Sequence, residues 1–216
     1  MIEVKIIAIE APVDPWGSDL FYDREVINAT ASAKGYTVID FFQNVDDLVA
    51  KIRPLIAAPN KCLHLLEIIG HGCPGRLDGM AEEGDLLTIW AESVAYWGRQ
   101  LMTLAPLGAP RGWCEDDCSI YLSGCNTGLS HIPEDSSKSI AEMLADAMPF
   151  SQTSFLHHIT VYGSKGYVSG TNMNGDEKTF SSYSSLLPDF GGVDAPAYKG
   201  SSDAKGNACW IPYKNW

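Results

Sequence analysis

The sequence of 216 residues is poor in basic side chains, with 15 Lys and Arg against 27 Asp and Glu and a net charge of −12 at pH 7. A chain this acidic repels phosphate backbones and anionic lipids, so we expect neither nucleic acid nor a membrane surface as its partner. It also lacks any apolar run of the ~18 residues that a membrane span requires. The first segment is interrupted by Glu3, Lys5 and Glu10 and does not have the pattern of a signal peptide.

Cysteine is also sparse. Six cysteines in a chain of this length are too few for the disulfide framework of a small secreted domain. We therefore expect free thiols and a cytoplasmic location. The six are Cys62, Cys73, Cys114, Cys118, Cys125 and Cys209.

Strand and helix patterns alternate along the chain, which predicts an α/β fold with a mainly parallel sheet and helices on both faces. Short apolar runs predict strands at Val4–Ile9, Tyr36–Phe42, Cys62–Ile69, Ser119–Ser123 and Ile159–Gly163. Helical spacing predicts helices at Asp23–Ala33, Val45–Ala57, Ala91–Leu104 and Ser139 to about Met148. Residues 76–88 suit a hairpin or a loop. We expect a single domain over residues 1–216, with its core at 1–171 and an irregular extension at 172–216.

Two of the predicted strands end in unusual sequences, Gly70-His71-Gly72 and Gly124-Cys125. In parallel sheets, functional groups gather at the carboxyl ends of the strands, so His71 and Cys125 meet if these strands are neighbours. An imidazole beside a cysteine takes its proton or stabilises the thiolate. The backbone N–H groups of Gly72 and Cys125 are suitable donors to an oxyanion. The pattern therefore predicts a nucleophilic cysteine hydrolase.

At these residues the sequence resembles the caspase-like cysteine peptidases, in particular the bacterial branch that contains the CHAT domains. An apolar strand followed by His-Gly, and another followed by a small residue and Cys, is the signature of that clan. Residues 122–128 (LSGCNTG) are similar to the CHAT nucleophile segment, although Gly124 replaces the more usual alanine. The 54 residues between His71 and Cys125 agree with the caspase spacing of about 50. The likeness extends over roughly residues 1 to 171, with its specificity in about a dozen positions.

The resemblance implies a caspase-like fold and a cysteine endopeptidase that acts on a protein or peptide substrate. It implies His71 and Cys125 as the catalytic dyad, Gly72 as an oxyanion donor, and no metal or other cofactor. Because the caspase pentapeptide Q-A-C-x-G is absent, a preference for aspartate does not follow. The oligomeric state is left open.

Acidic side chains in the connectors between His71 and Cys125 suggest a preference for a basic residue before the scissile bond. We take Asp116 and Asp117 as candidate substrate-binding residues. The other acidic residues of these connectors are Glu82, Glu83, Asp85 and Glu115. On the third strand, His64 and Glu67 are expected to face polar partners within the protein rather than substrate.

Two alternatives remain open at this point. Cys114 and Cys118, with Cys125, His131 or His71, offer enough soft ligands for a zinc ion, although the sequence lacks a second closely spaced pair. A non-catalytic caspase-like module used for recognition is the other alternative, and the intact His71/Cys125 pair argues against it.

Overall fold

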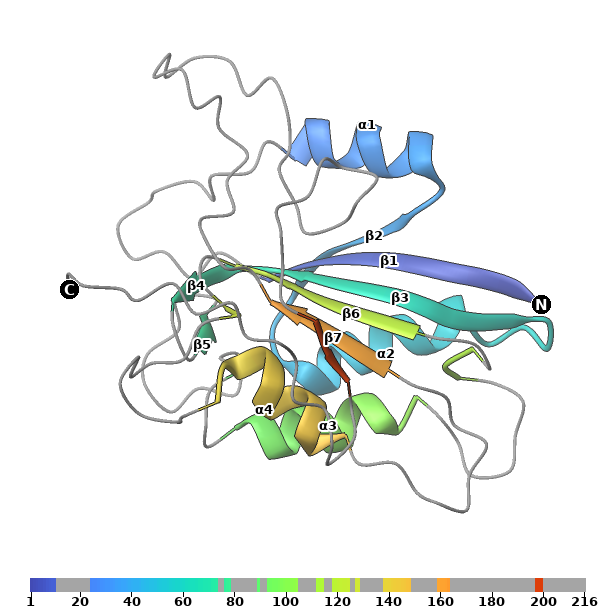
Figure 1. Cartoon of the computed structure of the whole chain (residues 1–216). Coiled ribbons are helices and arrows are strands. Elements are labelled where there is room, and N and C mark those ends of the chain that lie inside the picture. The colour runs from blue at the N-terminus through green and yellow to red at the C-terminus, as the bar shows by residue number, and fades with distance from the viewer. Residues whose placement is uncertain are drawn as a thin grey trace, which may run out of the picture.

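The computed structural model describes residues 1–10, 24–73, 76–78, 89, 93–104, 112–114, 118–124, 127–128, 138–148, 159–163 and 197–199. These residues form one six-stranded sheet, a separate two-stranded hairpin and helices (Figure 1). The strands of the large sheet are β1 (Ile2–Glu10), β2 (Thr37–Phe42), β3 (Lys61–Ile69), β6 (Cys118–Ser123), β7 (Ile159–Gly163) and β8 (Ala197–Lys199). The hairpin consists of β4 (His71–Cys73) and β5 (Arg76–Asp78). The helices are α1 (Arg24–Lys34), α2 (Val45–Leu55), α3 (Val94–Met102) and α4 (Ile140–Ala147).

The large sheet has the strand order β2-β1-β3-β6-β7-β8. The first five strands in this order are parallel, and β8 pairs antiparallel with β7. Figure 1 shows α1 on one face of the sheet and α2, α3 and α4 on the other. The predicted α/β class, with a mainly parallel sheet between helices, is confirmed. Strand β8 lies in the segment for which the sequence pattern predicts no element. Within the described ranges, no helix is long and apolar enough to cross a membrane.

The main hydrophobic core lies between the sheet and the three helices α2, α3 and α4. Alternate residues along most of the central strands belong to this core, and most of them are fully buried, as are Leu48, Ile52 and Trp97 of the helices. The strand residues include Ile6, Ala8, Leu66, Ile68, Ile120 and Leu122. Other residues of β3 and β6 are buried as well but lie outside this cluster, namely Leu65, Glu67, Ile69, Tyr121 and Ser123. Since successive strand residues point to opposite faces, the polar pair belongs to the face that carries α1.

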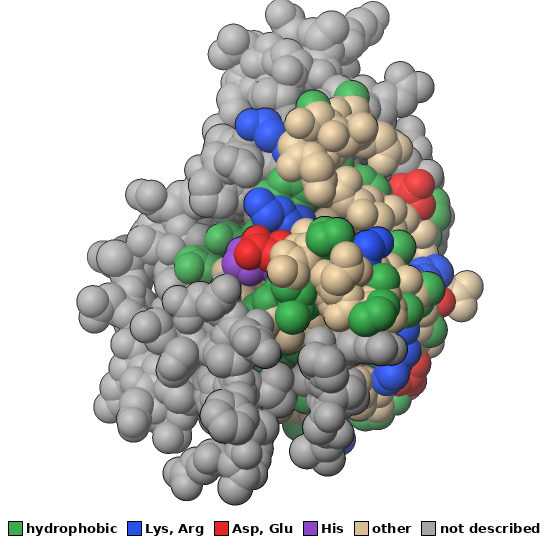
Figure 2. All heavy atoms as spheres, turned by 90° about the vertical axis from the view of Figure 1, so that its right-hand side faces the viewer, with side chains coloured by type: hydrophobic (Ala, Val, Ile, Leu, Met, Phe, Trp, Pro, Cys, Tyr) green, Lys and Arg blue, Asp and Glu red, His purple; other side chains and the backbone are tan. Residues whose placement is uncertain are grey.

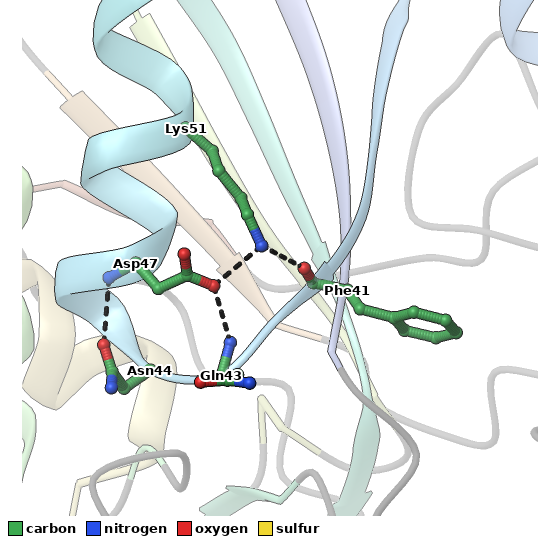
Figure 3. A network of polar contacts seen from close by, with 5 residues as sticks. All are labelled: Phe41, Gln43, Asn44, Asp47 and Lys51. Atoms are coloured by element: carbon green, nitrogen blue, oxygen red, sulfur yellow. Dashed lines mark hydrogen bonds and ion pairs between the residues drawn. The ribbon is translucent and has the colours of Figure 1, made fainter.

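A polar network fixes the start of α2 (Figure 3). The side chain of Asn44 caps the helix by accepting the N–H of Asp47 at 2.9 Å. Lys51 Nζ donates to Asp47 at 2.8 Å and to the carbonyl of Phe41 at 2.5 Å. Phe41 has a φ of +49°, which costs a non-glycine residue about 1–2 kcal/mol. A register shift in the β1–β2 ladder accompanies this residue, and Figure 3 shows its ring directed away from α2.

A disulfide joins Cys62, in β3, to Cys114, with a sequence separation of 52. The segment around Cys114 also pairs with the beginning of β3, because Leu63 N–H donates to Gly112 O at 2.7 Å and Cys114 N–H donates to Leu63 O at 2.9 Å. The expectation of free thiols is therefore wrong for these two cysteines, which the folded chain brings together although they are far apart in the sequence. Cys118 is buried and is not part of this disulfide. The cytoplasmic location stays a prediction.

Reduction of the Cys62–Cys114 disulfide should lower the free energy of unfolding. For a loop of 52 residues, the loss of chain entropy in the unfolded state corresponds to at most about 4 kcal/mol. We expect urea unfolding with and without dithiothreitol to show this difference. A protein with both Cys62→Ser and Cys114→Ser is the control, since its unfolding should not respond to the reductant. An equal midpoint for the unmodified protein under both conditions would contradict the bond.

Candidate functional site

The carboxyl ends of β3 and β6 lie side by side. The two strands are parallel neighbours, with Ile69 opposite Ser123, and Gly70 N–H donates to Ser123 O at 3.4 Å. The two strands are thus neighbours, which is the condition for His71 and Cys125 to meet. His71 follows Ile69 by two residues, and Cys125 follows Ser123 by two residues. The chain order reverses between β1 and β3, so β3 borders the position at which open α/β sheets bind their ligands.

The predicted site residues are described to different extents. His71 begins β4 and Gly72 is the middle residue of that strand, and for both only the backbone is described. Cys125, Asp116 and Asp117 lie outside the described residues. The hairpin β4–β5 and helix α3 occupy the connection between β3 and β6.

The backbone N–H of Gly72 points away from its hairpin partner. Gly72 lies opposite Leu77 in the antiparallel β4–β5 pair. Leu77 directs both of its backbone groups to Ile89, donating to its carbonyl at 3.0 Å and accepting its N–H at 2.8 Å. In an antiparallel ladder, the N–H and C=O of one residue point to the same side, so Gly72 and Leu77 form a non-hydrogen-bonded pair. The N–H of Gly72 is therefore directed out of the hairpin, as an oxyanion donor requires.

Thr127 is bonded to the end of β6 and borders the segment that contains Cys125. This residue is fully buried, and its hydroxyl lies 2.7 Å from Leu122 O and 3.2 Å from Gly124 O, both within donating distance. Gly124 N–H also donates to Leu122 O at 3.0 Å, which closes a tight turn directly after β6. The residues on both sides of positions 125 and 126 are thus tied to the end of one central strand. Thr127 was not predicted as a site residue from the sequence, because a threonine in a loop is not distinctive without its partners.

The backbone around Thr127 and Gly128 also packs closely against β7 and α4. A Cβ at Gly163, the last residue of β7, would lie 2.6 Å from the nitrogen of Gly128 and 2.8 Å from Cβ of Ala141. The N–H of Ala141, in the first turn of α4, donates to Thr127 O at 3.4 Å. The turn therefore rests on the end of β7 and on the beginning of α4.

The residues that flank Asp116 and Asp117 lie at the opposite edge of the sheet. Cys114 pairs with the beginning of β3, and Cys118 is the first residue of β6. Five residues of a strand separate Cys118 from Ser123, which corresponds to about 17 Å. Figure 2 looks at the face where the parallel strands begin, and it shows acidic and basic side chains scattered over that face rather than gathered by sign.

Glu67 and His64 each lie near a polar side chain of the protein. His64 Nε2 lies 3.9 Å from the carboxylate of Glu3, near the beginning of the sheet. Glu67 is fully buried and accepts a hydrogen bond from the hydroxyl of Ser123. An acidic residue in an apolar strand is the sequence signal for such a partner, but the partner's identity depends on the strand pairing.

The zinc alternative loses one of its ligands. Cys114 is bonded to Cys62 and has no thiolate to offer a metal ion in this form. Cys118 is buried, and its Sγ lies 3.5 Å from the carbonyl oxygens of Leu63 and Cys114. Cys125 and His131 lie outside the described residues. The closely spaced cysteine pair on which this alternative depends is therefore not a pair of free thiols.

The comparisons with known proteins supply no family. No family model matches the sequence, and no curated protein matches it significantly. The functional assignment consequently depends on the residues and geometry described above.

Replacing Thr127 by valine should slow the alkylation of Cys125. Valine keeps the shape of threonine but removes the hydroxyl that bonds the end of β6, and losing a buried hydrogen bond costs about 1–3 kcal/mol. We expect a slower reaction of Cys125 with iodoacetamide, measured by peptide mapping. Thr127→Ser retains the hydroxyl and should restore most of the rate. If Thr127→Val and Thr127→Ser react equally fast, the hydroxyl does not position the turn.

Gly163→Ala should disturb the same turn, whereas Gly98→Ala should not. At both positions a Cβ would meet backbone atoms at 2.5 to 2.6 Å, Ala147 O for Gly98 and Gly128 N for Gly163. Each substitution should therefore lower stability by about 1–3 kcal/mol. Only Gly163 contacts the segment that follows Cys125, so only Gly163→Ala should slow the alkylation of Cys125 under native conditions. Equal effects of both variants on that rate would indicate a general loss of stability instead.

Proposed function

We propose that the protein is a cysteine endopeptidase, with Cys125 as the nucleophile and His71 as its proton-transfer partner. The observation that carries the proposal is the in-register pairing of Ile69 with Ser123 at the ends of β3 and β6. Neighbouring strands lie about 4.8 Å apart. His71 and Cys125 each come two residues after this pair, so the chain leaves the sheet toward both of them from adjacent points. The resemblance of these two segments to caspase-like peptidases, strongest for the CHAT domains, supports the same assignment.

The reaction begins with attack of the Cys125 thiolate on the carbonyl carbon of the scissile peptide bond. The negative charge that develops on the carbonyl oxygen is stabilised by the N–H of Gly72, which is directed out of the hairpin. The C–N bond then breaks as the imidazolium of His71 gives its proton to the leaving amine. A thioester remains on Cys125.

Water completes the cycle. His71 takes a proton from the attacking water, the C–S bond breaks, and the carboxylic acid product leaves with the thiolate restored. Fixed backbone donors are favourable for this chemistry because they need no reorganisation as the charge develops. The tight turn at Thr127 and the support of Gly163 serve the same purpose for the nucleophile.

Cys125→Ala and His71→Ala should each abolish most of the turnover of a diverse peptide library. General acid–base catalysis accelerates a reaction by about a hundredfold to ten-thousandfold, so His71→Ala should lower kcat/KM by about a hundredfold or more. Because the two residues act as one unit, the double variant should be no worse than Cys125→Ala alone. The measurement is mass-spectrometric profiling of the library with each variant.

His64→Ala is the matched control for His71→Ala. His64 is also a histidine of the segment around β3, but it lies in the first half of the strand, away from the carboxyl end. This variant should retain activity, and all variants should keep the far-UV circular dichroism of the unmodified protein. Cleavage that persists in Cys125→Ala would contradict the proposal. Binding of peptides without any cleavage, and without reaction of Cys125 with thiol-directed probes, would favour the recognition module instead.

A further inference from the structure

The carboxylate of Glu67 is an unusual group for the centre of a sheet. Glu67 has an exposed fraction of 0% and lies between Ile7 of β1 and Tyr121 of β6. Burying a carboxylate is unfavourable unless it is compensated, and an apolar residue of similar volume often serves stability as well or better. Such a residue close to a candidate site points to a functional role.

The side chain of Glu67 reaches toward the candidate site. In the strand register Glu67 lies opposite Tyr121, whereas its carboxylate accepts the hydroxyl of Ser123, two residues further along β6. The side chain therefore leans toward the carboxyl end of the strands. Ser123 is opposite Ile69 and comes two residues before Cys125. The carboxylate thus lies directly below the strand ends that lead to His71 and Cys125.

Aromatic rings lie beside this carboxylate on the same face. Tyr121 stacks on Tyr162 of β7, with 4.5 Å between the ring centroids and 6° between the planes. Burial, followed by the neighbouring Tyr162, raises the pKa of Tyr121 to about 12, so its hydroxyl is neutral at physiological pH. A carboxylate beside a serine hydroxyl and a tyrosine ring, here that of Tyr121, is a set of groups that binds guanidinium and ammonium ions.

We propose that Glu67, oriented by Ser123, binds the cationic side chain of the substrate residue that precedes the scissile bond. The inference rests on the proposed peptidase function and names its specificity residue. The strand residues from Glu67 to Ile69 span about 7 Å, a depth that an extended arginine or lysine side chain reaches from the strand ends. The preference for a basic residue, which the sequence suggested from the connector carboxylates, is here attributed to a buried carboxylate on a central strand. This role replaces the expectation that Glu67 faces partners within the protein rather than substrate. Charge–charge recognition is stronger at a buried carboxylate than at an exposed one, which solvent and salt screen.

Two peptidyl acyloxymethyl ketones test this proposal, identical except for arginine or leucine at the residue that carries the ketone. The Cys125 thiolate forms a C–S bond to the methylene carbon, and the C–O bond to the carboxylate leaving group breaks. The labelling rate at Cys125 is measured by intact mass and peptide mapping. We expect the arginine probe to react about tenfold to hundredfold faster than the leucine probe. Glu67→Gln, which keeps the volume of the side chain and an acceptor for Ser123, should remove most of this ratio.

Glu3→Gln is the matched control, because it removes the same charge from the opposite end of the sheet and should leave the ratio unchanged. If Glu67→Gln does not fold, Ser123→Ala decides, since it removes the hydroxyl that orients the carboxylate and should lower the ratio too. The specificity assignment alone is overturned if the arginine and leucine probes label the unmodified protein at nearly equal rates. It is also overturned if the rate ratio is unchanged in Glu67→Gln or, where that variant does not fold, in Ser123→Ala. Failure of both probes to label Cys125 in the unmodified protein overturns the proposed function and this inference with it.

Discussion

The pairing of β3 with β6 is the constraint on which the rest of the candidate site depends. A slip of one residue would exchange the faces of an entire strand. It would move Ser123 away from Glu67 and bring apolar residues of the core to the other face. The pairing is held at both ends, by the bond from Gly70 to Ser123 at the carboxyl end and by the Cys62–Cys114 disulfide near the beginning. The register of two central strands thereby determines which groups meet beyond them.

The two faces of the sheet differ in chemistry. Toward α2, α3 and α4 the central strands present apolar side chains that pack into one cluster. Toward the other face, β3 and β6 present the carboxylate of Glu67, the hydroxyl of Ser123 and the ring of Tyr121. Buried polar groups stabilise a fold less than apolar packing does, unless their hydrogen bonds are well formed. Their position below the ends of the central strands agrees with the role that we propose for Glu67.

Local patterns were sufficient to predict the five parallel strands and the four helices, but not strand β8. The apolar runs at residues 62–69 and 119–123 correspond to β3 and β6, and the segment between them contains the hairpin and α3. Long-range partners were not predictable, because they depend on how the strands are ordered. The Cys62–Cys114 disulfide and the bond between Ser123 and Glu67 belong to this class. The positive φ of Phe41 was also unpredictable, since neither glycine nor asparagine marks the position.

Strand β8 has a consequence for the association of the molecule with other chains. It has three residues and pairs antiparallel with β7, along the side of β7 that faces away from β6. An uncovered edge strand offers a row of backbone donors and acceptors to any passing extended chain, and natural proteins protect such edges with short strands or loops. Val161 of β7 is fully buried and strongly β-forming, so β7 without this cover would be a favourable template for intermolecular sheet growth. Residues close to the end of the sequence thus protect a strand on which the turn of the candidate nucleophile rests.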